Sequence, residues 1–259
     1  MSPDPQTPSD HERRIGQLER QLEALLKAVI PIGVALLGAR DFHQMLETIL
    51  LEAQTLCHAD GGTLYLRSED DQLKFVLLRN DSLGIAMGGT SGAEIPYPPL
   101  PLYDRVSGAP NQRNVATFAA LTGESVSIAD AYRAEGFEFS GTMAFDQLSG
   151  YRSTSFLTVP LRNAAQRVIG VLQLINATDP VSGAVVPFDP CTVPVVESLS
   201  SLAAAALEVY LREDRLRREI SDLHIQIDEV KRAKQVAEIA DTDYFQTLQQ
   251  RARRLRERT

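Results

Sequence analysis

The side chains that most often carry catalysis are few in this chain of 259 residues and stand far apart. The four histidines form no His-x-x-x-His pair, so the sequence holds no motif for a catalytic metal site. Neither of the two cysteines has a Cys-x-x-Cys partner, and neither a P-loop nor a Gly-x-Ser-x-Gly elbow is present. We therefore expect no enzymatic activity, no catalytic residue and no metal site. The histidines and cysteines of the chain are His11, His43, His58, His224, Cys57 and Cys191.

One polar side chain interrupts an otherwise apolar strand predicted at 168–175. Alternate residues of this strand are apolar on both faces, which indicates that both faces are covered. Gln173 is the exception, and a buried amide left without partners costs roughly 1–3 kcal/mol. The amide of Gln173 either bonds to a neighbouring loop or forms the edge of a ligand site, where it can both donate and accept.

The composition is that of an ordinary globular protein, with 44% hydrophobic and 23% charged residues. Its 26 basic and 34 acidic residues give a net charge of −8, which argues against nucleic acid as a partner. Two cysteines fit a reducing cytoplasm. Residues 1–14 lack the apolar core of a secretory signal, and the longest apolar run, 28–39, is too short for a membrane span. We expect a cytoplasmic protein.

The elements that must position Gln173 follow from periodicity and turn signals. Apolar residues at helical spacing predict helices over 41–58 and 114–121 and from 193 onward. Irregular segments are expected at 80–111 and 130–149. Strands are expected at 63–67, 73–78, 125–128, 155–161 and 168–175. This order predicts an α+β domain with an antiparallel sheet of about six strands and helices on one face.

Narrow apolar seams indicate coiled coils at both ends of the chain. The residues of the first seam follow one another at alternating intervals of three and four positions: Ile15, Leu18, Leu22, Leu25, Val29, Ile32 and Leu36. The second comprises Leu216, Ile220, Leu223, Ile227 and Val230. The predicted organisation is a disordered start (1–10), an N-terminal coiled coil (11–40), the α+β domain (41–210) and a C-terminal coiled coil with a basic tail (211–259). The two seams predict a homodimer, although the first seam could instead pack on its own domain. The basic tail is either a fraying terminus or a segment that docks on a partner.

Four separated segments together resemble a GAF domain, and the resemblance covers about residues 41–210. It is nearest to the GAF domains that precede bacterial cyclic-nucleotide cyclases and HD-GYP phosphodiesterases, and it extends to the regulatory GAF domains of animal cyclic-nucleotide phosphodiesterases. The segments are 127–132, 145–153, 159–161 and 170–176. Members that bind cyclic nucleotides carry a further signature, Asn-Lys…Phe…Asp-Glu. This chain matches it at Asn176, Phe188 and Asp189, but it has Ala177 at the Lys position.

The resemblance implies a small-molecule pocket on one face of the sheet, with a cyclic nucleotide as a possible ligand. The acidic and hydroxyl positions near such a ligand correspond to Asp146, Ser149 and Ser153, and the polar strand position corresponds to Gln173. The helix start that would offer backbone amides to the phosphate corresponds to Asn114, Val115, Ala116 and Thr117. Helix N-terminal amides favour an anion, so that role is physically reasonable.

Two functions remain open from the sequence. The first is a dimeric sensor that binds a ligand and signals through its coiled coils to a protein partner of the C-terminal helix. The second is a ligand-free scaffold that dimerises and recruits proteins. A tetrapyrrole is not expected, because no cysteine lies between Cys57 and Cys191 for a bilin and no histidine lies between His58 and His224 for a haem.

Overall fold

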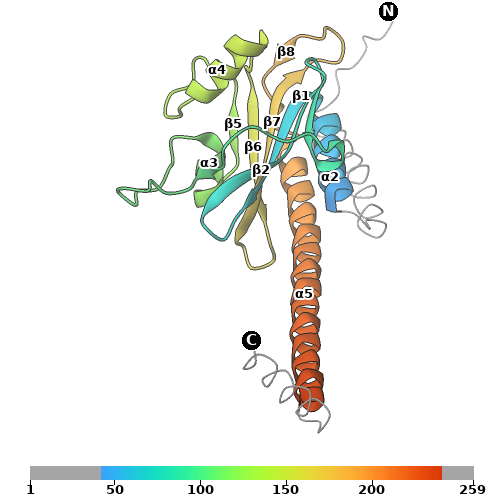
Figure 1. Ribbon diagram of the computed structural model, residues 1–259. Coiled ribbons are helices and arrows are strands. Elements are labelled where there is room, and N and C mark those ends of the chain that lie inside the picture. The colour runs from blue at the N-terminus through green and yellow to red at the C-terminus, as the bar shows by residue number, and fades with distance from the viewer. Residues whose placement is uncertain (1–41, 241–259) are drawn as a thin grey trace, which may run out of the picture. The chain divides into compact units, whose positions relative to one another are not determined.

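An antiparallel sheet with helices on both faces forms the centre of this computed structural model, which describes residues 42–240 (Figure 1). The α+β class predicted from the sequence is confirmed, but the sheet has eight strands rather than about six. Its order is β3-β2-β1-β7-β6-β5, with β4 beside β2 and β8 beside β7. The strands are β1 (Ala59–Arg67), β2 (Gln72–Asn80), β3 (Ile85–Gly88), β4 (Leu100–Pro101), β5 (Val126–Ile128), β6 (Phe156–Arg162), β7 (Val168–Thr178) and β8 (Val185–Val186).

The central strands bring three polar residues into one row. Thr63 of β1 lies opposite Gln173 of β7, and Gln173 lies opposite Thr158 of β6. Directly paired residues of antiparallel strands point to the same face. The row Thr63–Gln173–Thr158 therefore crosses one face of the sheet at its middle.

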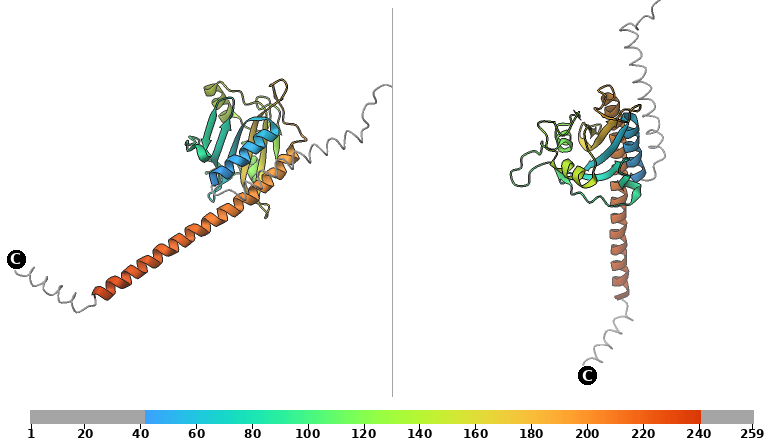
Figure 2. Two further views of the ribbon diagram at one scale, coloured as in Figure 1. Left: turned by 90° about the vertical axis from the view of Figure 1, so that its right-hand side faces the viewer. Right: turned by 90° about the horizontal axis from the view of Figure 1, so that it is seen from above.

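The opposite face is covered by α2 (Phe42–Cys57) and by the first part of α5 (Val193–Ala240) (Figure 2). Leu46, Ile49 and Leu50 of α2 are almost fully buried, as the helical spacing of its apolar residues predicts. The close approach of α2 favours a glycine at position 62, because a Cβ there would lie 2.6 Å from Leu50 Cδ1 and that side chain would have to move.

The face with the polar row carries α3 (Val115–Thr122) and α4 (Ser140–Ser149) (Figure 1). Helices thus cover both faces, which corrects the prediction of helices on one face. The segment 130–149 was expected to be irregular, and the structure shows a helix over its second half. Only Asp146 is buried in α4, so this helix has no apolar stripe that a periodicity argument could detect.

The helix α5 belongs to the sheet domain up to Glu208 and continues from Val209 to Ala240 as a separate unit. The stretch Val193–Glu213 has 21 residues and contains an 18-residue window with a mean hydropathy of 1.3, so it could cross a membrane by length and composition alone. Core helices have the same character, and Val196, Leu199 and Leu207 are fully buried in the domain. The predictions for residues 1–40 and for the basic tail lie outside the described residues.

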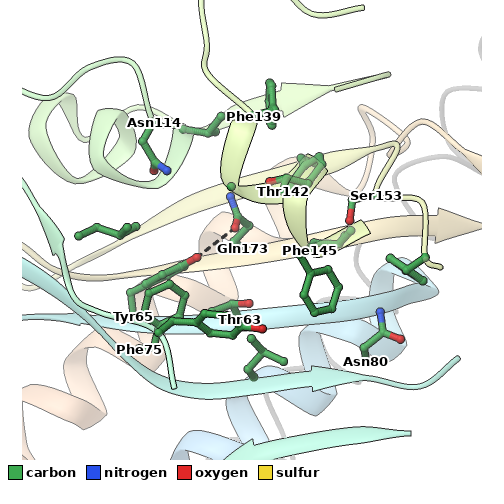
Figure 3. A pocket seen from close by; sticks show the side chains of 18 of the residues that line it. Thr63, Tyr65, Phe75, Asn80, Asn114, Phe139, Thr142, Phe145, Ser153 and Gln173 are labelled. Atoms are coloured by element: carbon green, nitrogen blue, oxygen red, sulfur yellow. Dashed lines mark hydrogen bonds between the residues drawn. The ribbon is translucent and has the colours of Figure 1, made fainter. Parts of the chain in front are cut away.

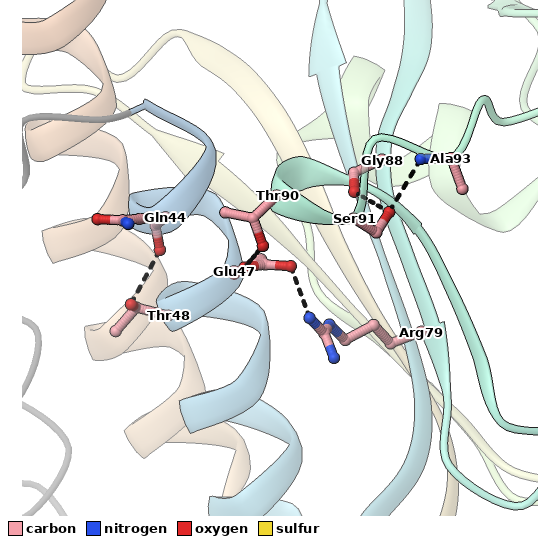
Figure 4. A network of polar contacts seen from close by, with 8 residues as sticks. All are labelled: Gln44, Glu47, Thr48, Arg79, Gly88, Thr90, Ser91 and Ala93. Carbon is pink, nitrogen blue, oxygen red and sulfur yellow. Dashed lines mark hydrogen bonds and ion pairs between the residues drawn. The ribbon is translucent and has the colours of Figure 1, made fainter.

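An ion pair joins α2 to the edge of the sheet (Figure 4). Arg79 Nη2 of β2 lies 2.6 Å from Glu47 Oε1 of α2, and the Thr90 hydroxyl donates to Glu47 Oε2. Burial raises the pKa of Glu47, but the hydrogen bonds from Thr90 and Arg79 outweigh it and hold that pKa below its ordinary value of 4.5.

Replacing Glu47 by Gln is expected to lower the free energy of unfolding by about 1 kcal/mol at pH 7 through loss of these bonds. Because the folded pKa is depressed, the contribution is present above pH 4.5 and is lost as the pH falls through the folded value. Urea unfolding should therefore show a larger stability difference between wild type and Glu47→Gln at pH 7 than at pH 3. Glu135→Gln, at an exposed position, is the control. A difference that persists unchanged in acid would contradict this account.

Candidate functional site

A cavity of about 290 Å³ lies over the face of the sheet that carries the polar row (Figure 3). Strands β1, β2, β6 and β7 contribute to its lining, as do the start of α3 and one side of α4. The volume is at the lower end of the range for ligand pockets, about 300–1,000 Å³, and fits a small ligand. The strand and helix residues around it include Thr63, Tyr65, Phe75, Asn80, Asn114, Phe139, Thr142, Phe145, Phe156 and Gln173.

The amide of Gln173 is held in one orientation at the floor of the cavity. Its Nε2 donates to Thr158 Oγ1 at 3.1 Å. Tyr65 Oη donates to its Oε1 at 3.2 Å (Figure 3). Its partners lie on neighbouring strands, and not on a loop as one of the two sequence interpretations supposed. One N–H and one oxygen lone pair of the amide have no partner within residues 42–240.

Burial keeps the Tyr65 hydroxyl protonated as a donor to this amide. Burial raises the pKa of Tyr65 well above its ordinary value, and a hydrogen bond with Thr63 only partly opposes the shift. The floor of the cavity is therefore uncharged at neutral pH.

Aromatic rings form the walls. The ring centroids of Tyr65 and Phe75 are 4.7 Å apart, those of Phe75 and Tyr97 are 5.6 Å apart, and those of Phe139 and Phe156 are 5.4 Å apart. Such spacings are typical of packed aromatic pairs. The site residues predicted from the sequence do not include Tyr65, Phe75 or Tyr97. The alternation of β1 and β2 was the available signal, but it required the register between the two strands.

Asp146 does not line the cavity but holds the loop between α4 and β6, residues 150–155, by hydrogen bonds. Its buried carboxylate accepts the Ser153 N–H and the Ser153 hydroxyl, both at 2.8 Å, and the Tyr132 hydroxyl at 2.7 Å. Ser149, at the end of α4, donates to Phe145 O and also lies outside the cavity lining. Of the three residues predicted from the acidic and hydroxyl motif, only Ser153 reaches the cavity.

Two of the first-turn amides of α3 are already occupied. Asn114 is the N-cap, and its Oδ1 accepts from Ala116 N at 2.9 Å and from Thr117 N at 3.2 Å. Asn114 and Val115 line the cavity, whereas Ala116 and Thr117 are buried behind them. The prediction that these residues present free amides to a phosphate is wrong for Ala116 and Thr117, because the capping side chain takes both donors.

Asn176 of β7 also forms hydrogen bonds with the loop between α4 and β6. Its Oδ1 accepts from Thr154 N at 2.7 Å, and its Nδ2 donates to Tyr151 Oη and Arg152 O, both at 2.8 Å. The backbone of Asn176 has φ 56°, a left-handed conformation that asparagine tolerates better than most residues. Asn176 thus shapes the cavity wall at Tyr151 without lining the cavity itself.

Metal binding has no support in the described part of the chain. Within residues 42–240, no group of three or more His, Cys, Asp or Glu side chains is placed to hold an ion. Cys57 is buried, and burial raises the pKa of its thiol to about 12, so it remains protonated at neutral pH.

Comparison with known proteins identifies the fold and relates part of the sequence to phosphodiesterases. A segment of 62 residues is 40% identical to the dual 3',5'-cyclic-AMP and -GMP phosphodiesterase 11 of Drosophila melanogaster, and one of 64 residues is 36% identical to phosphodiesterase 11A of Takifugu rubripes. These segments are 24% and 25% of this chain, but only 4% and 7% of the two phosphodiesterases.

A solved structure, the GAF domain of a phosphoenolpyruvate-protein phosphotransferase from Coxiella burnetii, matches with a TM-score of 0.52. The match covers 74% of this chain and 98% of that one at 14% sequence identity, so it shows the fold alone. The nearer resemblance to bacterial cyclase and HD-GYP GAF domains stays a prediction. The family model of the GAF domain matches residues 41–207, well over half of the chain. The chain therefore belongs to the GAF domain family.

Proposed function

We propose that this chain is a non-enzymatic, cytoplasmic regulatory module: a dimeric sensor that binds a small ligand over the sheet and signals through its terminal helices. The observation that carries the proposal is Gln173, a buried amide fixed by Tyr65 and Thr158 with part of its hydrogen-bonding capacity directed at a cavity. Polar groups that converge in a mostly apolar pocket are typical of ligand sites.

A cyclic nucleotide is the first ligand class to test. The phosphodiesterases that share a segment with this chain are named for acting on cyclic AMP and cyclic GMP. In such a complex the base would meet the Gln173 amide. The phosphate would have to lie near the start of α3, where Asn114 now caps the helix.

The signal would leave through α5 to a signalling protein that contacts its C-terminal part. Beyond Val209 this helix exposes apolar side chains at the spacing of a coiled-coil seam, including Leu216, Ile220, Leu223 and Ile227. Two such helices in a dimer can shift between packing arrangements of similar energy, so ligand binding in one domain can alter a partner's docking surface.

The state of the cavity supports a sensor over a ligand-free scaffold. A scaffold predicts that Phe137, Phe139 or Phe145 fills the space. Instead Phe139 packs on Phe156 at the wall and Phe137 packs on Phe118 at 5.3 Å between ring centroids. Phe145 forms part of the lining, and about 290 Å³ stays open beside it.

A thermal-shift screen of the full chain tests the proposal. The compounds are cyclic AMP, cyclic GMP, cyclic dinucleotides and the corresponding nucleosides. A ligand at 100 times its dissociation constant should add about 2.7 kcal/mol of stability. A folded dimer that responds to none of them would favour the scaffold.

A further inference from the structure

We infer that the cavity selects an uncharged planar ligand and discriminates against a phosphate or carboxylate in the same place. This deepens the proposed function and rests on it, and it ranks the uncharged nucleosides above the cyclic nucleotides as ligands. The inference concerns the charge and shape that the lining residues can accommodate.

The lining offers an anion no free cation. Among the described residues, the charged side chains of the lining belong to Arg79 and Glu138. The guanidinium of Arg79 pairs with Glu47 on the opposite face of the sheet, where its Nη2 lies 2.6 Å from Glu47 Oε1 and its Nε is buried without a hydrogen-bond partner among the described residues (Figure 4). Glu138 is itself acidic, and it accepts a hydrogen bond from Ser140. A ligand phosphate would be desolvated with no opposite charge to compensate, which is strongly unfavourable.

The start of α3 does not replace the missing cation. An unoccupied helix N-terminus attracts anions because its first amides have no partners. Here Asn114 Oδ1 accepts from two of them, on Ala116 and Thr117. An anion that used these two amides would have to displace the cap, and loss of an Asn cap costs about 1 kcal/mol.

The same lining suits a neutral ring. Tyr65, Phe75 and Tyr97 form a continuous aromatic wall, and the pair Phe139–Phe156 forms another. The amide of Gln173 has one N–H and one lone pair left for a ligand, which is the donor and acceptor set that an amide, lactam or aminopyridine requires. A small planar heterocycle with such a group would satisfy both the ring contacts and the amide.

Matched pairs of compounds test the charge preference directly by calorimetry on the full chain. The pairs are adenosine with cyclic AMP, guanosine with cyclic GMP, and nicotinamide with nicotinate. In every pair that binds, the uncharged member is expected to bind at least about tenfold more tightly. Equal or tighter binding of the charged member would overturn the inference and leave the proposed sensor function intact. Binding of no compound would overturn both.

The variant Gln173→Met tests whether the ligand forms hydrogen bonds with the amide of Gln173. It keeps the length of the side chain and removes the amide, so the uncharged member should bind about tenfold more weakly, as expected for lost hydrogen bonds. Gln147→Met on the exposed side of α4 is the matched control and should bind like wild type. Wild-type affinity in folded Gln173→Met would show that the ligand does not use this amide and would overturn the inference.

Discussion

Asp146→Ala is expected to lower the free energy of unfolding by about 3 kcal/mol, the largest effect of any single substitution proposed for this chain. The carboxylate accepts three hydrogen bonds, two of them from the buried Ser153 and one from Tyr132. Removing it leaves buried donors without partners, which costs more than the net gain from an ordinary hydrogen bond. Asp146 is also the one buried residue of α4, so this helix should loosen over the cavity.

Urea unfolding measures the stability change, and hydrogen exchange of the α4 amides measures the local one. Exchange in α4 should become faster in Asp146→Ala, while exchange in β1 and β7 should follow the global stability only. Asp81→Ala, at an exposed position, is the matched control and should change stability by less than about 0.5 kcal/mol. Similar stabilities for the two variants would show that Asp146 does not brace the loop.

The double substitution Ile220→Lys and Leu223→Lys is expected to convert the proposed dimer into a monomer. Both side chains are more than half exposed in the single chain, at 54% and 56%, and both belong to the predicted seam of α5. Two Lys per helix at seam positions would face the same positions of the partner helix, where charge repulsion and loss of apolar contact oppose pairing. The dissociation constant should rise at least about 100-fold.

Light scattering at micromolar concentration measures this change. The control is Leu148→Lys with Val181→Lys, which alters two apolar side chains that are 91% and 94% exposed and lie outside the seam. This control should remain dimeric. A monomeric wild type, or a dimeric Ile220→Lys and Leu223→Lys variant, would contradict signalling through the paired helices.

The main strands and helices were predictable because each has its own periodic signal. The helix α2 and the strands β1, β2, β6 and β7 each contain apolar residues that recur at helical or strand spacing. Strands β4 and β8 have two residues each, which is too short for any period. The helix α4 was missed for a different reason, since the single residue it buries, Asp146, is polar.

The candidate site was predictable only where a polar residue stands among apolar neighbours in the sequence. Gln173 in an apolar strand was such a residue. Asp146 was identified but given the wrong role, because the sequence does not show that Tyr132 and Ser153 both point at its carboxylate. The placement of Phe75 beside Tyr65 depends on an irregularity in the pairing of β1 with β2 between Leu64 and Tyr65, which no local pattern reveals.

A single tryptophan in the cavity gives the most direct test of ligand binding at this site. The chain contains no tryptophan, so Phe145→Trp introduces one fluorophore into the lining and Leu148→Trp introduces one on the exposed side of the same helix. Titration with adenosine, guanosine, cyclic AMP and cyclic GMP should change the emission of Phe145→Trp saturably for at least one compound. The emission of Leu148→Trp should stay constant. No saturable change in folded, dimeric Phe145→Trp, or an equal change in both variants, would contradict a ligand site over the sheet.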